Sequence, residues 1–212
     1  MASVSAYARG GSEVWLTQTL KGTFWDGVTV QVEEEMMFDH GLLEEDTLFL
    51  VGYQFCPWVS LAAGHRLARA RPALSDHLRT EQRPTVDLTL KSPELLTLQL
   101  VFRSRFEWRD WDHRSGYMRY RERLRLKTSW AVTDFQLSPY VSCELLFEDK
   151  PHQASRKDLD QVRTDIGFSF HPIPSLKDLT CNLYYRQKQD KAATHHEWRA
   201  THVWGLHLLY SF

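Results

Sequence analysis

Charged residues, most of them arginine, recur at every second position in two stretches of this 212-residue chain. The first stretch reads RSRFEWR at 103–109, and the second reads RYRERLR at 119–125. A guanidinium pairs with a carboxylate through two parallel hydrogen bonds, and its charge attracts other anions. These arginines could therefore form ion pairs or bind anions, provided that one structural element holds their side chains on one face.

Apolar residues alternate with the arginines, as at Phe102, Phe106, Leu124 and Leu126. A period of two residues is typical of a β-strand, because successive side chains point to opposite faces. A charged face on strand after strand needs water or carboxylates along its whole length. A membrane-spanning barrel provides this by turning apolar side chains to lipid and charged side chains to a polar lumen. The pattern therefore predicts such a barrel.

Composition excludes several classes of protein. The net charge of −1 gives no electrostatic reason to expect a nucleic-acid partner. A mean hydropathy of −0.45, without a long apolar run, excludes a helical membrane protein. The 8 Trp and 8 Tyr suit the aromatic girdles of a membrane barrel. Three widely spaced cysteines, Cys56, Cys143 and Cys181, form neither a disulfide framework nor a zinc motif.

Alternation of this kind extends along the chain and predicts eleven strands, at about 12–21, 28–38, 47–55, 58–68, 82–91, 95–109, 117–130, 137–148, 161–170, 178–187 and 198–212. We expect a single all-β domain over 1–212, an antiparallel up-and-down transmembrane barrel. Bacterial barrels have an even number of strands. We therefore expect about 12 strands, with 10 strands as the alternative. The additional strand is either a short one at 2–9 within the terminal segment 1–11 or lies in sequence upstream of this chain.

The connections between these strands are expected to alternate in length. Short ones lie near 22, 56–57, 92–94, 133–134 and 172–174, and longer polar ones lie near 39–46, 69–80, 110–116, 149–160 and 188–197. Outer-membrane barrels have this asymmetry, with short periplasmic turns and longer extracellular loops.

One register turns a large charged set inward, and this set is the candidate site. Its members are Glu33, Glu35, Arg66, Asp87, Arg103, Arg105, Glu107, Arg119, Arg121, Arg123, Arg125, Glu144, Arg163, Asp165 and Arg186, with Arg109 in the same register. The charges either interlock and fill the barrel or line an anion-attracting lumen. If they only fill it, alanine at Arg103, Arg105, Arg121 or Arg123 should destabilise the barrel. If they line a pore, ion selectivity should change instead. Glu34 and Glu122 break the pattern by falling on the lipid-facing register.

Candidates for catalysis are scattered. Serines near strand ends include Ser60, Ser104, Ser115 and Ser142, and candidate histidines include His65, His113, His171, His202 and His207. His113 and Ser115 share one outer loop, but no nucleophile-elbow sequence is present. His195-His196-Glu197 does not have zinc-ligand spacing. We therefore predict no metal site, no cofactor and no catalytic residue.

Ten pieces of the chain, in order and spacing, resemble one family. They are Trp15-Leu16, Gly52-Tyr53, Gly64 with Arg66, RPTVDLTLK at 83–91, RSRFEWR at 103–109, YMRYRERLRL at 117–126, PYVSCELLFED at 139–149, Arg163 with Gly167, LYYRQK at 183–188 and the terminal strand. Over residues 12–212 the chain resembles an uncharacterised bacterial outer-membrane β-barrel family, the domain of unknown function 2490. The resemblance implies an outer-membrane barrel and brings no activity, cofactor or catalytic residue.

The last strand resembles the signal that barrel-assembly machinery reads, with Leu206, Leu208, Tyr210 and Phe212 at alternate positions. It departs from that signal at one place, because His207 stands where a glycine is usual and Gly205 lies two residues earlier. The N-terminal MASVSAYARG lacks the apolar core of a signal peptide. We therefore expect an export leader to have been removed from a protein of the bacterial outer membrane.

The sequence favours a small monomeric barrel without catalytic activity. Its role would be structural or a narrow passage for solutes or ions, and its partners would be outer-membrane lipid, the barrel-assembly machinery and small solutes or ions. The first alternative is an outer-membrane lipid-modifying hydrolase, which predicts a Ser–His or Asp–His pair near the outer rim. The second is a soluble lipocalin-like binding barrel, which predicts apolar side chains inside and charges outside.

Overall fold

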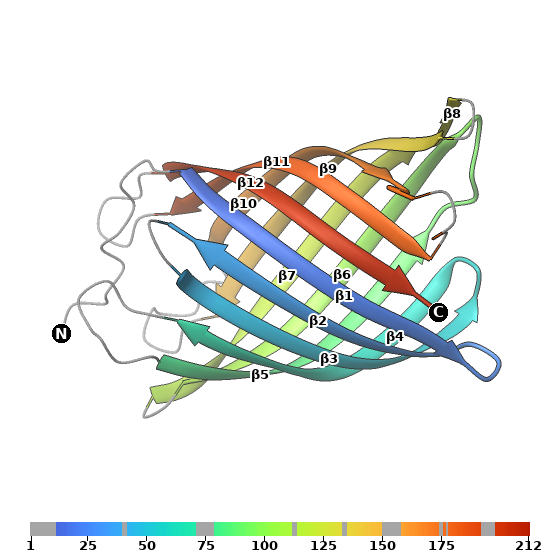
Figure 1. Ribbon diagram of the computed structural model, residues 1–212. Coiled ribbons are helices and arrows are strands. Elements are labelled where there is room, and N and C mark those ends of the chain that lie inside the picture. The colour runs from blue at the N-terminus through green and yellow to red at the C-terminus, as the bar shows by residue number, and fades with distance from the viewer. Residues whose placement is uncertain are drawn as a thin grey trace.

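The computed structural model of the chain is a closed β-barrel (Figure 1). The structure describes residues 12–39, 42–70, 79–111, 114–132, 135–149, 158–173, 176, 178–191 and 198–212. Its strands are β1 (Ser12–Phe24), β2 (Val28–Phe38), β3 (Leu42–Cys56), β4 (Val59–Ala70), β5 (Arg79–Lys91), β6 (Leu98–Trp111), β7 (Arg114–Thr128), β8 (Trp130–Val132), β9 (Phe135–Asp149), β10 (Asp158–Phe170), β11 (Leu179–Lys191) and β12 (Trp198–Ser211).

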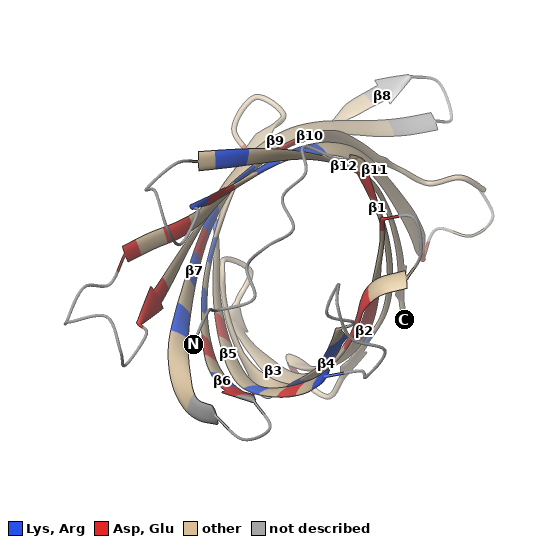
Figure 2. Cartoon of the chain, turned by 90° about the vertical axis from the view of Figure 1, so that its left-hand side faces the viewer, with Lys and Arg blue, Asp and Glu red and all other residues tan. Residues whose placement is uncertain are grey.

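Eleven of these strands form the ring that Figure 2 shows. Neighbours in the sequence are neighbours in the ring, except that β7 pairs directly with β9 and the three-residue β8 pairs only with β9. The ring closes between β1 and β12, which run parallel from Ser12 opposite His202 to Lys21 opposite Ser211. The other pairs are antiparallel, so the all-β barrel predicted from the sequence is confirmed.

The expected count of about 12 strands, or 10, is wrong for this ring. All eleven segments indicated by the alternation are strands. The expectation of an even number was wrong because it assumed that the first and last strands pair antiparallel. A parallel pair of first and last strands closes an odd number of strands equally well, since each still finds a hydrogen-bonding neighbour. The short strand expected at 2–9 lies outside the described residues.

The strict alternation of connection lengths is also wrong. At one end of the barrel the strands are joined through 39–41, 71–78, 112–113, 150–157 and 192–197. At the other end they are joined through 25–27, 57–58, 92–97, 133–134 and 171–178. Both ends therefore combine short and long connections, because several strands begin earlier or end later than the alternation indicated. We call the first the loop end and the second the turn end.

Side chains alternate between a buried inner face and an exposed outer face along the strands. On β1, Glu13, Trp15, Thr17 and Thr19 are buried while Val14 and Leu20 are exposed. The same alternation places buried Glu81, Arg83, Thr85 and Asp87 inside β5. The interior is thus mostly charged and the outer surface mostly apolar. This is the reverse of the distribution that the lipocalin-like alternative predicts.

The inner face also holds a small apolar cluster of Trp15, Met37 and Val203, with Leu43 packed against it. Because these residues lie on β1, β2, β3 and β12, the cluster joins strands on both sides of the parallel closure. The structure contains no helix capable of crossing a membrane within the residues it describes.

Candidate functional site

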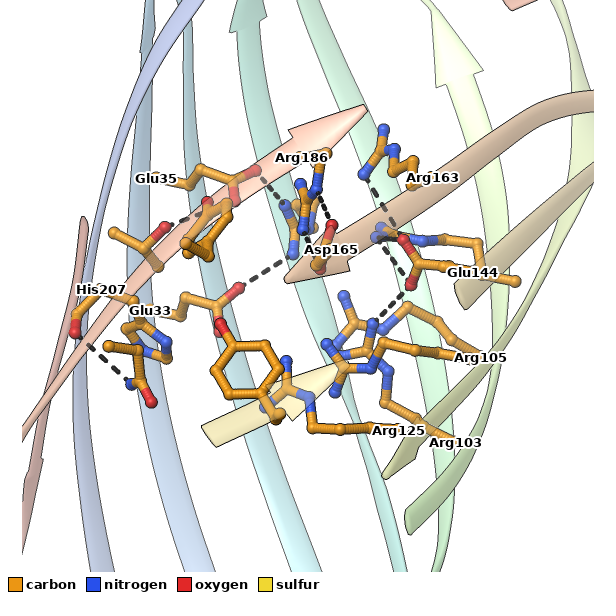
Figure 3. Close-up of a pocket in the computed structure, with 17 residues that line it drawn as sticks. Glu33, Glu35, Arg103, Arg105, Arg125, Glu144, Arg163, Asp165, Arg186 and His207 are labelled. Atoms are coloured by element: carbon orange, nitrogen blue, oxygen red, sulfur yellow. Dashed lines mark hydrogen bonds and ion pairs between the residues drawn. The ribbon is translucent and has the colours of Figure 1, made fainter. Parts of the chain in front are cut away.

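Most of the charged residues predicted to face inward surround one cavity inside the barrel (Figure 3). About 640 Å³ of space not occupied by atoms lies between these side chains, a figure that includes open solvent. All of the fifteen predicted residues line the cavity except Asp87, Glu107 and Arg119. Further lining residues are Thr17, Tyr140, Asn182, Tyr184 and His207. The lumen therefore brings together side chains from nearly all the strands of the ring.

The three predicted residues outside the cavity wall contact residues in or next to it. Asp87 accepts two hydrogen bonds of 2.6 Å from Nε and Nη2 of Arg105. Glu107 accepts a hydrogen bond of 3.1 Å from Arg121, and Arg119 donates to Glu148 at the loop end. Arg105 and Glu107 are almost completely buried. These pairs fix the inner faces of β5, β6 and β7 relative to one another.

A second group of ion pairs lies toward the loop end, and the sequence reasoning missed most of it. Arg83 donates to Glu81 at 2.8 Å, to Glu44 at 3.2 Å and to Asp46 at 3.4 Å. Arg109 bridges Glu81 on β5 and Glu148 on β9, the latter at 2.9 Å. Glu44, Asp46 and Glu81 were missed because the expected strands began at 47 and 82. Continuing the alternation backwards from Leu48 and Arg83 would have found them.

Around the cavity, each carboxylate forms ion pairs with one or more guanidinium groups from other strands. Arg66 contacts Asp46 at 2.7 Å, Glu33 at 3.1 Å and Glu35 at 3.9 Å. Asp165 accepts 2.6 and 3.0 Å bonds from Arg186, and a third bond from the hydroxyl of Ser142 at 3.1 Å. These carboxylates and guanidiniums hold each other in place through direct contacts.

Glu144 is shared among three arginines. Its carboxylate lies 2.9 Å from Arg103, 3.0 Å from Arg121 and 3.6 Å from Arg163. The cross-strand register places Arg103 opposite Arg123, so two like charges face each other between β6 and β7. Within the described part of the chain, neither Arg123 nor Arg125 has a carboxylate within 4 Å. This wall of the cavity therefore carries more positive charge than its neighbours neutralise.

Aromatic rings and glycines alternate along one inner row and hold several arginines. Tyr140, Gly167, Tyr184, Gly205 and Trp15 are successive register partners from β9 to β1. A Cβ at Gly167 would lie 2.8 Å from the Tyr140 ring, and a Cβ at Gly205 would collide with the Tyr184 ring. The glycines are therefore needed for close approach of the rings. This is the physical role of Gly205, which departs from the usual glycine position of the assembly signal.

Guanidinium groups rest on these rings. Arg125 lies 4.4 Å from the centre of the Tyr140 ring, and Arg186 lies 4.7 Å from the Trp15 ring and 5.1 Å from the Tyr184 ring. Such stacking stabilises a cation without neutralising its charge. Arg125 is thus positioned by an aromatic face while its donors stay available to another acceptor.

The two acidic residues that broke the alternation lie on the outer face with polar neighbours. Glu122 accepts a 2.7 Å hydrogen bond from Ser104, which stands opposite it on β6. Glu34 stands opposite Gln18, and both border a shallow surface groove with Leu208 and Tyr210. Local polar partners therefore accompany both carboxylates on a surface that is otherwise apolar.

The described residues contain no hydrogen-bonded Ser–His or Asp–His pair of the kind that the hydrolase alternative predicts. The described serine candidates, Ser60, Ser104 and Ser142, make no hydrogen bond to a described histidine. His207 instead contacts Thr19 at 2.9 Å, and His202 contacts Tyr185. His113 and His195-His196-Glu197 lie outside the described residues, and so does the side chain of Ser115. In the described part of the chain, no His, Cys, Asp or Glu side chains are grouped to hold a metal ion.

Comparison with known proteins identifies a family. A family model described as a protein of unknown function (DUF2490) matches residues 12–199, which are most of the barrel. A search of curated proteins finds no match to the chain.

Proposed function

This chain belongs to the DUF2490 family, and we propose that it spans the bacterial outer membrane and that its charged lumen is a narrow passage for small solutes or ions. The observation that carries this proposal is the inverted distribution of side chains. Charged residues are buried inside the ring, while large apolar residues are exposed over its outer surface.

The exposed apolar surface supports a lipid environment. Phe49, Val51, Leu124, Ile166 and Trp204 are all exposed on outward-facing strand positions. Apolar surface in water costs roughly 25 cal/mol per Å², and monomeric soluble proteins rarely expose patches beyond a few hundred Å². Contact with acyl chains removes this cost. Glu34 and Glu122 are tolerated there beside polar neighbours.

Strand length and aromatic placement agree with a membrane span. The barrel strands have 11 to 15 residues, and about 9–11 tilted residues are enough to cross the hydrocarbon core. Trp25, Phe55 and Trp58 are exposed at the turn end, and Trp108 and Trp198 are exposed toward the loop end. Such aromatic side chains favour the two interfaces between lipid and water.

The lumen supports a passage that is narrow and prefers anions. Barrels of about eight strands are filled by side chains, and those of 16 to 18 strands leave an aqueous channel. A ring of eleven lies between these sizes, and its ion pairs leave the cavity described above. Arg123 and Arg125, which have no carboxylate within 4 Å among the described residues, give the wall a net positive charge that concentrates anions.

The same proposal includes the partners and the route to the membrane. An export leader would direct the chain across the inner membrane, and the barrel-assembly machinery would insert it next to outer-membrane lipid. Tyr210 and Phe212 are exposed on the last strand. Phe212 also exchanges backbone hydrogen bonds of 2.9 Å with Lys21 and Thr23 on β1. The proposed assembly signal thus adjoins the closure of the ring.

Conductance in planar bilayers tests the passage. We expect the refolded protein to give small, steady channels whose reversal potential in a potassium chloride gradient indicates anion preference. Persistent silence from protein that is folded and inserted would contradict the passage and leave a plugged structural barrel. Cation preference would contradict the electrostatic reasoning.

A further inference from the structure

We infer that Arg103, Arg123 and Arg125 form a binding site for a small tetrahedral oxyanion of the phosphate class inside the barrel. This inference rests on the proposed function, because it names the class of solute that the lumen takes. The three arginines lie on β6 and β7 and line one wall of the cavity, and Figure 3 labels two of them.

The wall formed by these three arginines is short of carboxylates. Arg103 has one carboxylate neighbour, Glu144, and shares it with Arg121 and Arg163. Arg123 is the register partner of both Arg103 and Glu144, but no described carboxylate approaches it within 4 Å. Like charges that face each other repel. A bound dianion between the guanidiniums would remove this repulsion.

Two of these arginines also have a buried donor that lacks an acceptor among the described residues. The Nε atoms of Arg103 and Arg125 are buried and have no hydrogen-bond partner in the described part of the chain, as is also true of Arg66, Arg83 and Arg121, but only Arg103 and Arg125 belong to the wall that is short of carboxylates. Leaving a buried charged donor unpaired is costly. An oxyanion has several acceptor oxygens, and guanidinium groups bind them in a planar, bidentate way that a single halide cannot use.

The surrounding groups confine the anion to this wall. Glu33 and Glu35 belong to β2 and contact Arg66, and Asp165 contacts Arg186. These carboxylates repel an anion from the parts of the cavity that they line. Tyr140 stands under Arg125 and holds its guanidinium by stacking. The site is therefore built from arginines that are already positioned.

A cationic approach leads to the site from the turn end. Lys91 and Arg125 are both register partners of Val101, and Lys127 follows Arg125 on the same face of β7. The loop end, in contrast, contains Glu44, Glu81 and Glu148 among its arginines. We therefore expect the anion to enter from the turn end.

Calorimetric titration of the refolded barrel in zwitterionic detergent tests the site. Inorganic phosphate is added at neutral pH, and sodium chloride of equal ionic strength serves as the reference. We expect saturable binding of about one phosphate per barrel, and weak binding of chloride. R123Q and R125Q should each raise the dissociation constant at least about tenfold, because each removes a charge-assisted donor.

R69Q is the matched control, since Arg69 is exposed on the outer register of β4 and changes the net charge equally. It should change phosphate affinity by less than about twofold. Among the residues that the structure describes, R123Q leaves no closely paired carboxylate without its partner, so we expect it to fold. R125Q provides an independent second variant.

Absence of saturable binding to folded protein would overturn the site, and so would equal affinity in R123Q, R125Q and the parent. Because this assay does not measure conductance, it tests the phosphate site independently of the proposed passage. Binding without channels would support the site and contradict the passage. Channels without phosphate binding would support the passage and contradict the site.

Discussion

Replacing Arg105 with glutamine should destabilise the barrel far more than the same change at Arg123. Arg105 is 2% exposed and holds Asp87 through two hydrogen bonds of 2.6 Å. Its removal leaves a buried carboxylate without its partner, which costs about 3–5 kcal/mol. Arg123 has no described carboxylate within 4 Å and faces Arg103. R123Q should therefore change the free energy of unfolding by less than about 1 kcal/mol.

The assay is a reversible guanidinium titration of protein folded in detergent or lipid, followed by tryptophan fluorescence. We expect R105Q to lower the free energy of unfolding by at least about 3 kcal/mol, which is more than a hundredfold in the equilibrium constant. Adding Asp87→Asn should recover a large part of this loss, since neither charge then remains unpaired. Equal losses in R105Q and R123Q would refute the distinction between paired and uncompensated arginines.

Three further outcomes follow from the same geometry. Gly205→Ala should lower the free energy of unfolding by about 1–3 kcal/mol, because its Cβ meets the Tyr184 ring; full stability in the same titration would contradict the close packing. Cys143 is exposed on the outer face, so a polarity-sensitive thiol dye on Cys143, in a variant without the other two cysteines, should report a hydrocarbon environment in vesicles; a water-like emission would contradict that orientation. Arg123→Glu should shift the reversal potential toward cations in planar bilayers, and an unchanged value would remove Arg123 from the passage.

Much of the fold could be predicted from the sequence because the two faces of each strand differ strongly. Arg103 and Arg105 alternate with Ser104 and Phe106, and this contrast alone places a strand and both of its faces. Strand ends were predicted less well. Acidic residues such as Glu44 and Glu81 are as common in polar loops as in a charged interior, so composition does not distinguish the two.

The closure of the ring and the pairing of its charges could not be predicted. Closure depends on hydrogen bonds between β1 and β12, which lie at opposite ends of the chain. Glu144 is the direct register partner of Arg123, yet its closest contacts are with Arg103 and Arg121. The ion-pair partner of a side chain that crosses the lumen depends on the length of the side chain and on the curvature of the barrel. The alternation of residues encodes neither.

The most direct test of the central claim is heat-modifiable gel mobility after refolding, with lipid vesicles compared with plain buffer. The account predicts a compact band that forms only with lipid or detergent and shifts on boiling, because the apolar outer face needs acyl chains before the ring can close. A protein that stays soluble and folded in plain buffer, with no shift on boiling, would contradict the membrane-spanning barrel.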